Sequence, residues 1–246
     1  MKKLLLVFAV ACCTILAIIG GYEPVSADND TGTVTDIDGN VYQTVKIGNQ
    51  VWTVENLRTT KYNDGTPIPL VTDSVAWKAL NTSGYCYYNN TTNADNIKKY
   101  GALYNWYVVN TKKLAPKGWH VPTDAEWTTL ENYLIANGYN WDGTTTGNKI
   151  AKSMAAKTDW ETSATLPGAI GNDLMKNNRS GFSALPGCYR GIDGNFYLCG
   201  ILGFWWSATE RDASTAYYRD LSYFVDTFIG YNYNKSCGLS VRLLRD

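Results

Sequence analysis

Aromatic and β-branched residues recur in short runs in two parts of the chain. In residues 181–246 these runs are separated by clusters of Gly, Asn, Asp and Ser at a spacing of roughly 8 to 12 residues, which is typical of an antiparallel, turn-rich sheet. Residues 34–57 repeat the pattern, with turns at Asp38-Gly39 and Gly48-Asn49, and predict a three-stranded meander. The chain between these two parts is predicted to contain one short strand at residues 84–88 and loops at residues 58–80 and 89–96.

Between the strand-rich parts, apolar positions change to a helical spacing. Thr123 and Glu126 form a capping box, in which the Thr123 hydroxyl accepts from the Glu126 amide and the Glu126 carboxylate accepts from the Thr123 amide. Asn137-Gly138 is a C-terminal stop signal. The apolar stripe of this helix comprises Trp127, Leu130 and Leu134. Two more helices are predicted at residues 100–109 and, on the surface, at residues 148–157. Strands, then helices, then strands indicate an α+β fold.

A hairpin is predicted around Asp193-Gly194, because this pair favours a two-residue type I′ turn. Counting outward from the turn places Arg190 opposite Tyr197 and Cys188 opposite Cys199. Directly opposed Cβ atoms lie about 4.5 to 5.5 Å apart, somewhat closer in non-hydrogen-bonded pairs, so a cross-strand disulfide is within reach. The alternative is a pair of reduced, half-buried cysteines.

The first 27 residues have the pattern of a secretory signal peptide. A basic head at residues 1–3 precedes an apolar run at residues 4–19, and Val25-Ser26-Ala27 resembles a cleavage site. The run is shorter than the roughly 20 residues of a membrane-spanning helix. We therefore expect cleavage after Ala27, a polar lead-in at residues 28–33 and a single domain at residues 34–246. Lipidation at Cys12, within a loose lipobox, is an alternative.

Export changes the interpretation of the cysteines. After cleavage four remain, and an even number in an oxidising compartment indicates two disulfides. If the hairpin selects Cys188–Cys199, the second pair by exclusion is Cys86–Cys237. There is no C-x-x-C motif and His120 is the single histidine, so we expect no zinc site.

Composition and charge narrow the range of partners. The formal net charge is zero and no basic block occurs, so there is no electrostatic basis for binding nucleic acid or an anionic membrane. The 9 Trp and 18 Tyr suit both half-buried sheets and surfaces that bind sugars or proteins.

Six separated motifs resemble the Fibrobacter succinogenes major paralogous domain, over about residues 34–246. The motifs are IGNQVWTVENL at 47–57, YGALYNW at 100–106, PKGWHVPTDAEW at 116–127, GFSALPG at 181–187, FWWSATE at 204–210 and GLSVR at 238–242. The resemblance implies an exported bacterial surface protein with a C-type lectin-like α+β fold, related to the formylglycine-generating enzyme group, with antiparallel sheets, two to three helices and a turn-rich C-terminal part. Departures from the family pattern at Cys188, Cys237 and Leu243 leave the second disulfide open.

The C-terminal stretch is similar to the variable regions of target proteins of diversity-generating retroelements. That similarity implies a binding surface. Residues at every second position of a strand share one face, which holds for 218, 220, 222 and 224, and residues 231–234 are expected in a nearby loop. The alternative is that these aromatic residues pack inward. The expected ligand-binding residues are Arg211, Asp212, Tyr218, Asp220, Ser222, Phe224, Tyr231 and Tyr233.

The sequence supports an enzymatic function or a calcium site less well than it supports a binding protein. Enzymes of the formylglycine-generating type use a reactive cysteine pair and copper, whereas Cys188 and Cys199 are expected to form a structural disulfide. His120 precedes a capping box and lacks a G-x-S-x-G partner motif. Paired carboxylates of a glycosidase cannot be located from sequence spacing. No Glu-Pro-Asn, Gln-Pro-Asp or Trp-Asn-Asp triplet indicates calcium-dependent sugar binding.

The sequence thus predicts a non-catalytic, exported protein without cofactor or metal that binds a protein or glycan on a cell or host surface. The alternative is a structural or assembly module of the cell surface. A formylglycine-generating-type oxidase or a glycosidase is the less favoured reading.

Overall fold

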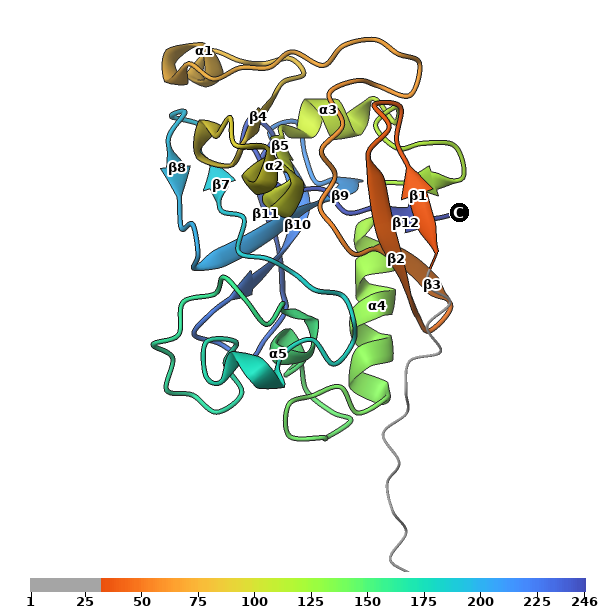
Figure 1. Ribbon diagram of the computed structural model, residues 1–246, viewed down its shortest axis with the longest axis vertical. Helices are drawn as coiled ribbons and strands as arrows, with labels where there is room; N and C mark the ends of the chain where they lie inside the picture. Colours follow the sequence, from red (N-terminus) through yellow and green to blue (C-terminus); the bar gives the residue numbers. More distant parts are fainter. Residues whose placement is uncertain (1–31) are drawn as a thin grey trace, which may run out of the picture.

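The computed structural model describes residues 32–246 of the chain, so the predicted signal peptide at residues 1–27 lies outside the described residues. Within this part, mostly antiparallel sheets combine with short helices and one longer helix, which confirms the predicted α+β class (Figure 1). Four sheets are present among the described residues: one of five strands, one of three and two of two.

The five-stranded sheet contains the predicted meander. Its strand order is β1-β2-β3-β12-β6. The Asp36 carboxylate accepts hydrogen bonds from the amides of Asp38 and Asn40 and thereby closes the first turn, where Gly39 has a φ of 80°. The strands are β1 (Thr33–Thr35), β2 (Val41–Ile47), β3 (Gln50–Thr53), β6 (Trp119–His120) and β12 (Leu244–Arg245).

The three-stranded sheet is built from the C-terminal stretch. Strands β9 (Leu202–Glu210), β10 (Thr215–Ser222) and β11 (Ile229–Asn234) are antiparallel, with β10 in the centre. Two expectations are corrected. β10 ends at Ser222, so Phe224 lies beyond the strand, and Tyr231 and Tyr233 lie in β11 rather than in a loop.

Helix α4 (Asp124–Ala136) packs between the two larger sheets, and its capping box is present as predicted. Its Trp127 ring lies 4.5 Å from the ring of Trp52 on β3, and the apolar stripe also contacts the buried side of the three-stranded sheet. Figure 1 shows α4 beside β2 and β3. The predicted apolar positions Trp127, Leu130 and Leu134 are all fully buried.

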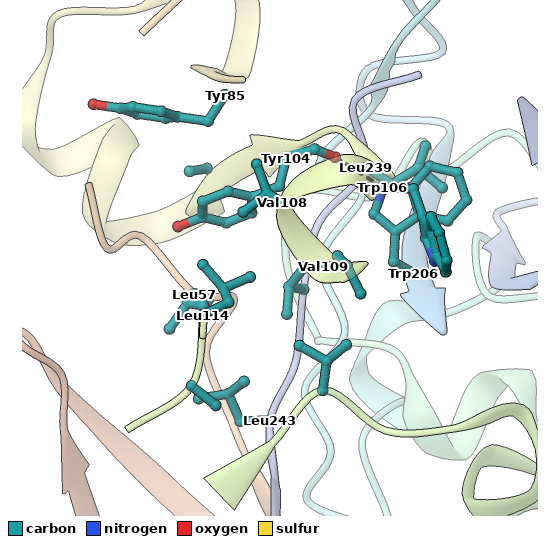
Figure 2. Close-up of a cluster of buried hydrophobic side chains, with 14 of the residues drawn as sticks. Leu57, Tyr85, Tyr104, Trp106, Val108, Val109, Leu114, Trp206, Leu239 and Leu243 are labelled. Carbon is teal, nitrogen blue, oxygen red and sulfur yellow. Dashed lines mark hydrogen bonds between the residues drawn. The ribbon is translucent and has the colours of Figure 1, made fainter. Parts of the chain in front are cut away.

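A second core cluster joins the N-terminal part to the C-terminal segment (Figure 2). The indole nitrogens of two of its tryptophans are satisfied by backbone carbonyls: Trp106 donates to Ser207 and Trp206 donates to Tyr104. Most of its labelled members belong to the sequence motifs of the chain or lie beside them: Leu57, Tyr104, Trp106, Val108, Val109, Trp206, Leu239 and Leu243. These motifs therefore contribute residues to the core.

A buried polar network links three other motif residues. The Arg242 guanidinium is fully buried, donates from Nε to Asn56 Oδ1 at 2.7 Å and caps the carbonyls of Thr53, Phe182 and Ser183. Asn56 Oδ1 also accepts from the indole of Trp205 at 2.9 Å. Burial lowers the pKa of Arg242 to about 9. The network ties β3, β9 and the C-terminal segment together, so these motif positions are structural.

The helix predicted at residues 100–109 is correct only from Trp106 onward. Gly101 has a φ of 76°, and Asn105 accepts from the amide of Val108 and so starts a new helix. The segment divides into strand β5 (Ala102–Tyr104), which pairs with β4 (Tyr85–Tyr87), and helix α3 (Trp106–Asn110). The predicted strand at residues 84–88 corresponds to β4.

The surface helix predicted at residues 148–157 is also corrected. Only α5 (Ala151–Met154) forms, and all four of its residues are buried. The Lys152 ammonium donates to the carbonyls of Ala169 and Asn172, which explains why this charge is buried. Helix α1 (Ser74–Lys78) lies in a segment predicted as a loop, and α2 (Ala94–Tyr100) begins in another. The structure also contains two 3-10 turns, η1 (Tyr88–Asn90) and η2 (Leu174–Lys176).

The hairpin of β7 (Tyr189–Arg190) and β8 (Phe196–Tyr197) exists, but its register differs from the prediction by one residue. Arg190 pairs with Phe196 rather than with Tyr197. The loop holds three residues, because the amide of Gly191 donates to the carbonyl of Asn195, and only Gly194 has a positive φ. This is a three-residue loop ending in a left-handed glycine, not a type I′ turn.

Candidate ligand-binding face

The register of the three-stranded sheet sorts its residues into two faces. Asp220 lies opposite Phe204 on β9 and Ile229 on β11, while Tyr218 lies opposite Trp206 and Tyr231. Directly opposed residues point to the same side of a sheet. The predicted sharing of one face by Tyr218, Asp220 and Ser222 therefore agrees with the strand register. The residues of this side that we call the aromatic face are Phe204, Tyr218, Asp220, Ser222, Ile229, Tyr231 and Tyr233, with Tyr189 packed against them from β7. Leu202, Trp206 and Ala216 lie on the same side and pack in the second core cluster, in which Phe204 is also buried.

The opposite side of the sheet is fixed on α4. Trp205 and Leu221 are buried in the core there, and Arg219 forms ion pairs with two α4 carboxylates, Asp124 at 2.8 Å and Glu131 at 3.0 Å. Burial raises the pKa of Glu131, and the nearby Arg219 opposes this effect. These contacts hold the sheet so that the aromatic face points away from the helix.

Four aromatic rings form a contiguous platform on this face. The ring centroids of Tyr189 and Phe204 are 5.0 Å apart, those of Phe204 and Tyr218 are 5.7 Å apart, and Tyr233 contacts both Tyr189 and Tyr218. Figure 1 shows the three-stranded sheet between the β7–β8 hairpin and α4. Next to the platform, Tyr231 is 64% exposed. Half-buried and exposed tyrosines of this kind offer both apolar area and hydroxyl groups to a ligand.

Two polar side chains on this face have no protein partner. Asp220 is only 7% exposed, and no residue in the range 32–246 forms a side-chain hydrogen bond or ion pair with its carboxylate, whose oxygens are not completely buried. Burial raises the pKa of Asp220 to about 7. The Ser222 hydroxyl is buried and likewise unpaired within the described part of the chain. Native proteins leave few buried polar groups unpaired, and those that remain call for an explanation.

Two other residues predicted to bind a ligand, Arg211 and Asp212, do not lie on the aromatic face. Arg211 and Asp212 are exposed in the β9–β10 turn, and the Asp212 carboxylate accepts from the backbone and side chains of Ser214 and Thr215. Hydrogen bonds from these residues hold the pKa of Asp212 well below its usual range. At about 3.3 Å per residue, the turn lies roughly 17 Å or more from Asp220 along β10. Asp212 thus shapes a turn.

Sequence reasoning missed three members of the aromatic face. Tyr189, Phe204 and Ile229 come from strands whose register with β10 is not encoded in the β10 sequence itself. The alternation of apolar residues along 202–206 is the one signal that could have placed Phe204 on a defined side. Phe224, predicted on the same face, lies after the strand end and is exposed.

The cysteines are free thiols throughout residues 32–246. Cys86 and Cys188 are buried in one small cluster, and Cys199 packs against it. Burial raises the pKa of Cys86 to about 12, as it does for Cys237. Cys237 belongs to another cluster, with Leu239 and Trp206. The structure therefore brings Cys188 and Cys199 together and places Cys86 and Cys237 in different clusters.

The remaining chemical groups are engaged in local contacts. His120 contacts Asp246 through Nδ1 at 2.6 Å and Glu126 through Nε2 at 2.9 Å. Within residues 32–246, no group of three or more His, Cys, Asp or Glu side chains is arranged to hold a metal ion. No helix in the same range is long and apolar enough to cross a membrane.

Comparison with known proteins places these features in a family. The description Fibrobacter succinogenes major domain matches the chain over residues 45–245, which include β3 to β12 and the whole aromatic face. No curated protein and no solved structure matches the chain. Because the family match spans most of the sequence, the chain belongs to the Fibrobacter succinogenes major domain family.

Proposed function

We propose that this protein is a surface-exposed binding protein that recognises a protein or glycan ligand through the aromatic face. The observation that carries the proposal is a buried, unpaired hydroxyl on Ser222 beside the mostly buried carboxyl of Asp220, both next to an aromatic platform. Polar groups without partners stabilise nothing in the free protein, whereas a ligand can pair with them. Exposed tyrosines next to them are residues that binding surfaces favour.

The resemblance of the chain supports the same function. Similarity to C-type lectin-like proteins and to variable regions of retroelement targets implies that the C-terminal stretch carries the binding residues. The side of β10 that faces α4 is occupied by ion pairs of Arg219. On the other side Phe204 is buried in the second core cluster, so the part of the aromatic face left for a ligand is its β11 edge, where Ile229 and Tyr231 are exposed.

A screen of the purified protein against arrays of glycans and cell-surface proteins tests this function. Tyr231→Ala and Asn232→Ala form a matched pair, because these neighbours on β11 point to opposite sides of the sheet. We expect Tyr231→Ala to weaken binding at least tenfold and Asn232→Ala to leave it within about twofold, as for an exposed aromatic anchor and a residue outside the contact. Equal binding by both variants would place the contact elsewhere.

The alternative function is a structural or assembly module, favoured by the exposed apolar side chains Phe224, Ile229 and Tyr231. Sedimentation at increasing concentration separates the two. Self-association that Tyr231→Ala removes, without any ligand on the arrays, supports the module; a monomer that binds a ligand supports the receptor.

Export is the second part of the proposal and rests on the pattern of residues 1–27. Mass spectrometry of the protein recovered from outside the cytoplasm should give an N-terminus at Asp28. A mass that includes a lipid on Cys12 would instead support the lipoprotein alternative, and an intact Met1 would contradict cleavage.

A further inference from the structure

The surroundings of Asp220 are apolar on both sides. Across the sheet it meets Phe204 and Ile229, and its neighbours along the same face are Tyr218 and Ser222. Directly opposed Cβ atoms are about 4.5 to 5.5 Å apart, so these side chains form the immediate environment of the carboxyl. The residues of the aromatic face thus include one acid and no base.

The nearest basic residues in the sequence are engaged elsewhere. Arg219 points to the other side of β10 and is saturated by α4, with bonds to Asp124, Glu131 and Thr128. Lys235, just after β11, is buried and forms an ion pair with Glu210. Within residues 32–246 the protein therefore offers no cation to the Asp220 carboxylate.

A buried carboxylate without a counter-charge is unfavourable, and a cation brought by a ligand removes that penalty. Burial alone raises the pKa of Asp220, with no contribution from a neighbouring charge. Tyr218 and Phe204, with ring centroids 5.7 Å apart, present aromatic surface beside the carboxyl, and aromatic faces attract ammonium and guanidinium groups. The unpaired Ser222 hydroxyl adds an acceptor for a further N–H.

We propose that the aromatic face binds a protein ligand through a lysine or arginine side chain that lies against the aromatic residues and pairs with the Asp220 carboxylate. This inference rests on the proposed function and narrows it. Lysine and arginine carry only donors and a positive charge, which complements a site made of acceptors and π faces. A neutral glycan brings hydroxyls but no charge and would leave the carboxylate uncompensated.

Synthetic heptapeptide arrays test the inference directly. The central residue is arginine, lysine, citrulline, glutamine or glutamate, and the flanking positions are randomised. Citrulline is the key comparison, because it keeps the shape of arginine and lacks its charge. At pH 8 we expect wild-type protein to bind arginine- and lysine-centred peptides at least tenfold better than citrulline-centred ones.

Two variants of equal charge control the experiment. Asp220→Asn should abolish the preference for basic peptides, whereas Asp95→Asn, which removes an exposed carboxylate of α2, should retain it. Asp220→Ser serves as a second variant, and urea unfolding confirms that each protein is folded. A basic preference that survives in folded Asp220→Asn, or no basic preference in wild type, overturns the inference.

Tyr231→Ala separates failure of this inference from failure of the proposed function. Ligands that Tyr231→Ala loses but Asp220→Asn retains, including neutral glycans, would leave the aromatic face as the site and show that no basic side chain pairs with Asp220. Ligands that neither substitution affects would contradict both.

Discussion

Replacing Asp220 by asparagine should make the protein more stable at alkaline pH. The pKa of this carboxyl is raised by burial to about 7, against an ordinary value of 3.8. The folded protein therefore holds the proton more tightly than the unfolded chain, and the free energy of unfolding falls as pH rises from about 4 to about 7. At roughly 1.4 kcal/mol per pKa unit, the loss in wild type is about 4 kcal/mol at most. Asparagine does not ionise, so the Asp220→Asn variant does not lose this stability as the pH rises.

The assay is urea unfolding followed by tryptophan fluorescence, with variant and wild type compared at pH 4.5, 6, 7 and 8.5. The stability difference should be small at pH 4.5 and grow to between about 1 and 4 kcal/mol at pH 8.5, since relaxation around the carboxylate reduces the maximum. Asp212→Asn is the contrast. The pKa of Asp212 is held low by the hydrogen bonds it accepts, so its stabilisation is present above about pH 4 and is lost on acidification.

Asp212→Asn should therefore be less stable than wild type at pH 8.5, opposite in sign to Asp220→Asn. If Asp220→Asn has the stability of wild type at every pH, the carboxyl is not desolvated and the reasoning about the aromatic face is refuted. Such a carboxyl lowers stability in the free protein, which is a cost that binding sites commonly carry.

Three further predictions concern the scaffold. Arg242→Met should lower the free energy of unfolding in urea by about 3 to 5 kcal/mol, because the buried acceptors that Arg242 satisfies lose their partner. The control Arg211→Met, at an exposed position, should change the free energy of unfolding by less than about 0.5 kcal/mol. Equal effects of the two substitutions would contradict the structural role of the Arg242 network. Thr123→Ala removes the capping box of α4 and should cost about 1 kcal/mol, so an unchanged unfolding midpoint would count against this cap. Non-reducing peptide mapping of exported protein should find Cys188 joined to Cys199, which packs against the same cluster; recovery of both as free thiols would argue for the reduced alternative.

The parts of the fold that were predicted correctly depend on interactions between residues close together in the sequence. The capping box at Thr123 places both of its partners within one turn of chain, so no distant contact decides where α4 begins. The turn at Asp38-Gly39 is likewise set by a glycine and the neighbouring Asp36 carboxylate. In β10 the period of two placed Tyr218, Asp220 and Ser222 on one face once the strand was identified.

Contacts between distant segments decided the parts that the sequence did not predict. The apolar positions of residues 100–109 fit a helix, yet pairing with β4 draws Ala102–Tyr104 into a strand and Asn105 caps a shorter helix. The Asp193-Gly194 pair was recognised as a turn, but a loop longer by one residue shifted the hairpin register.

The candidate site shows the same division. Its β10 residues followed from alternation, whereas the environment of Asp220 depends on Phe204 and Ile229 from other strands. Whether the carboxyl finds a partner is likewise a property of packing. Alternation cannot reveal that Arg219, one position away, is committed to α4.

Hydrogen–deuterium exchange of the full protein with and without a ligand recovered from the arrays is the most direct measurement of whether the aromatic face binds. The account predicts that added protection is concentrated in residues 218–222 and 229–234, with residues 33–53 of the five-stranded sheet unchanged. Protection centred on the five-stranded sheet, with exchange in β10 and β11 unaltered by a saturating ligand, would contradict it.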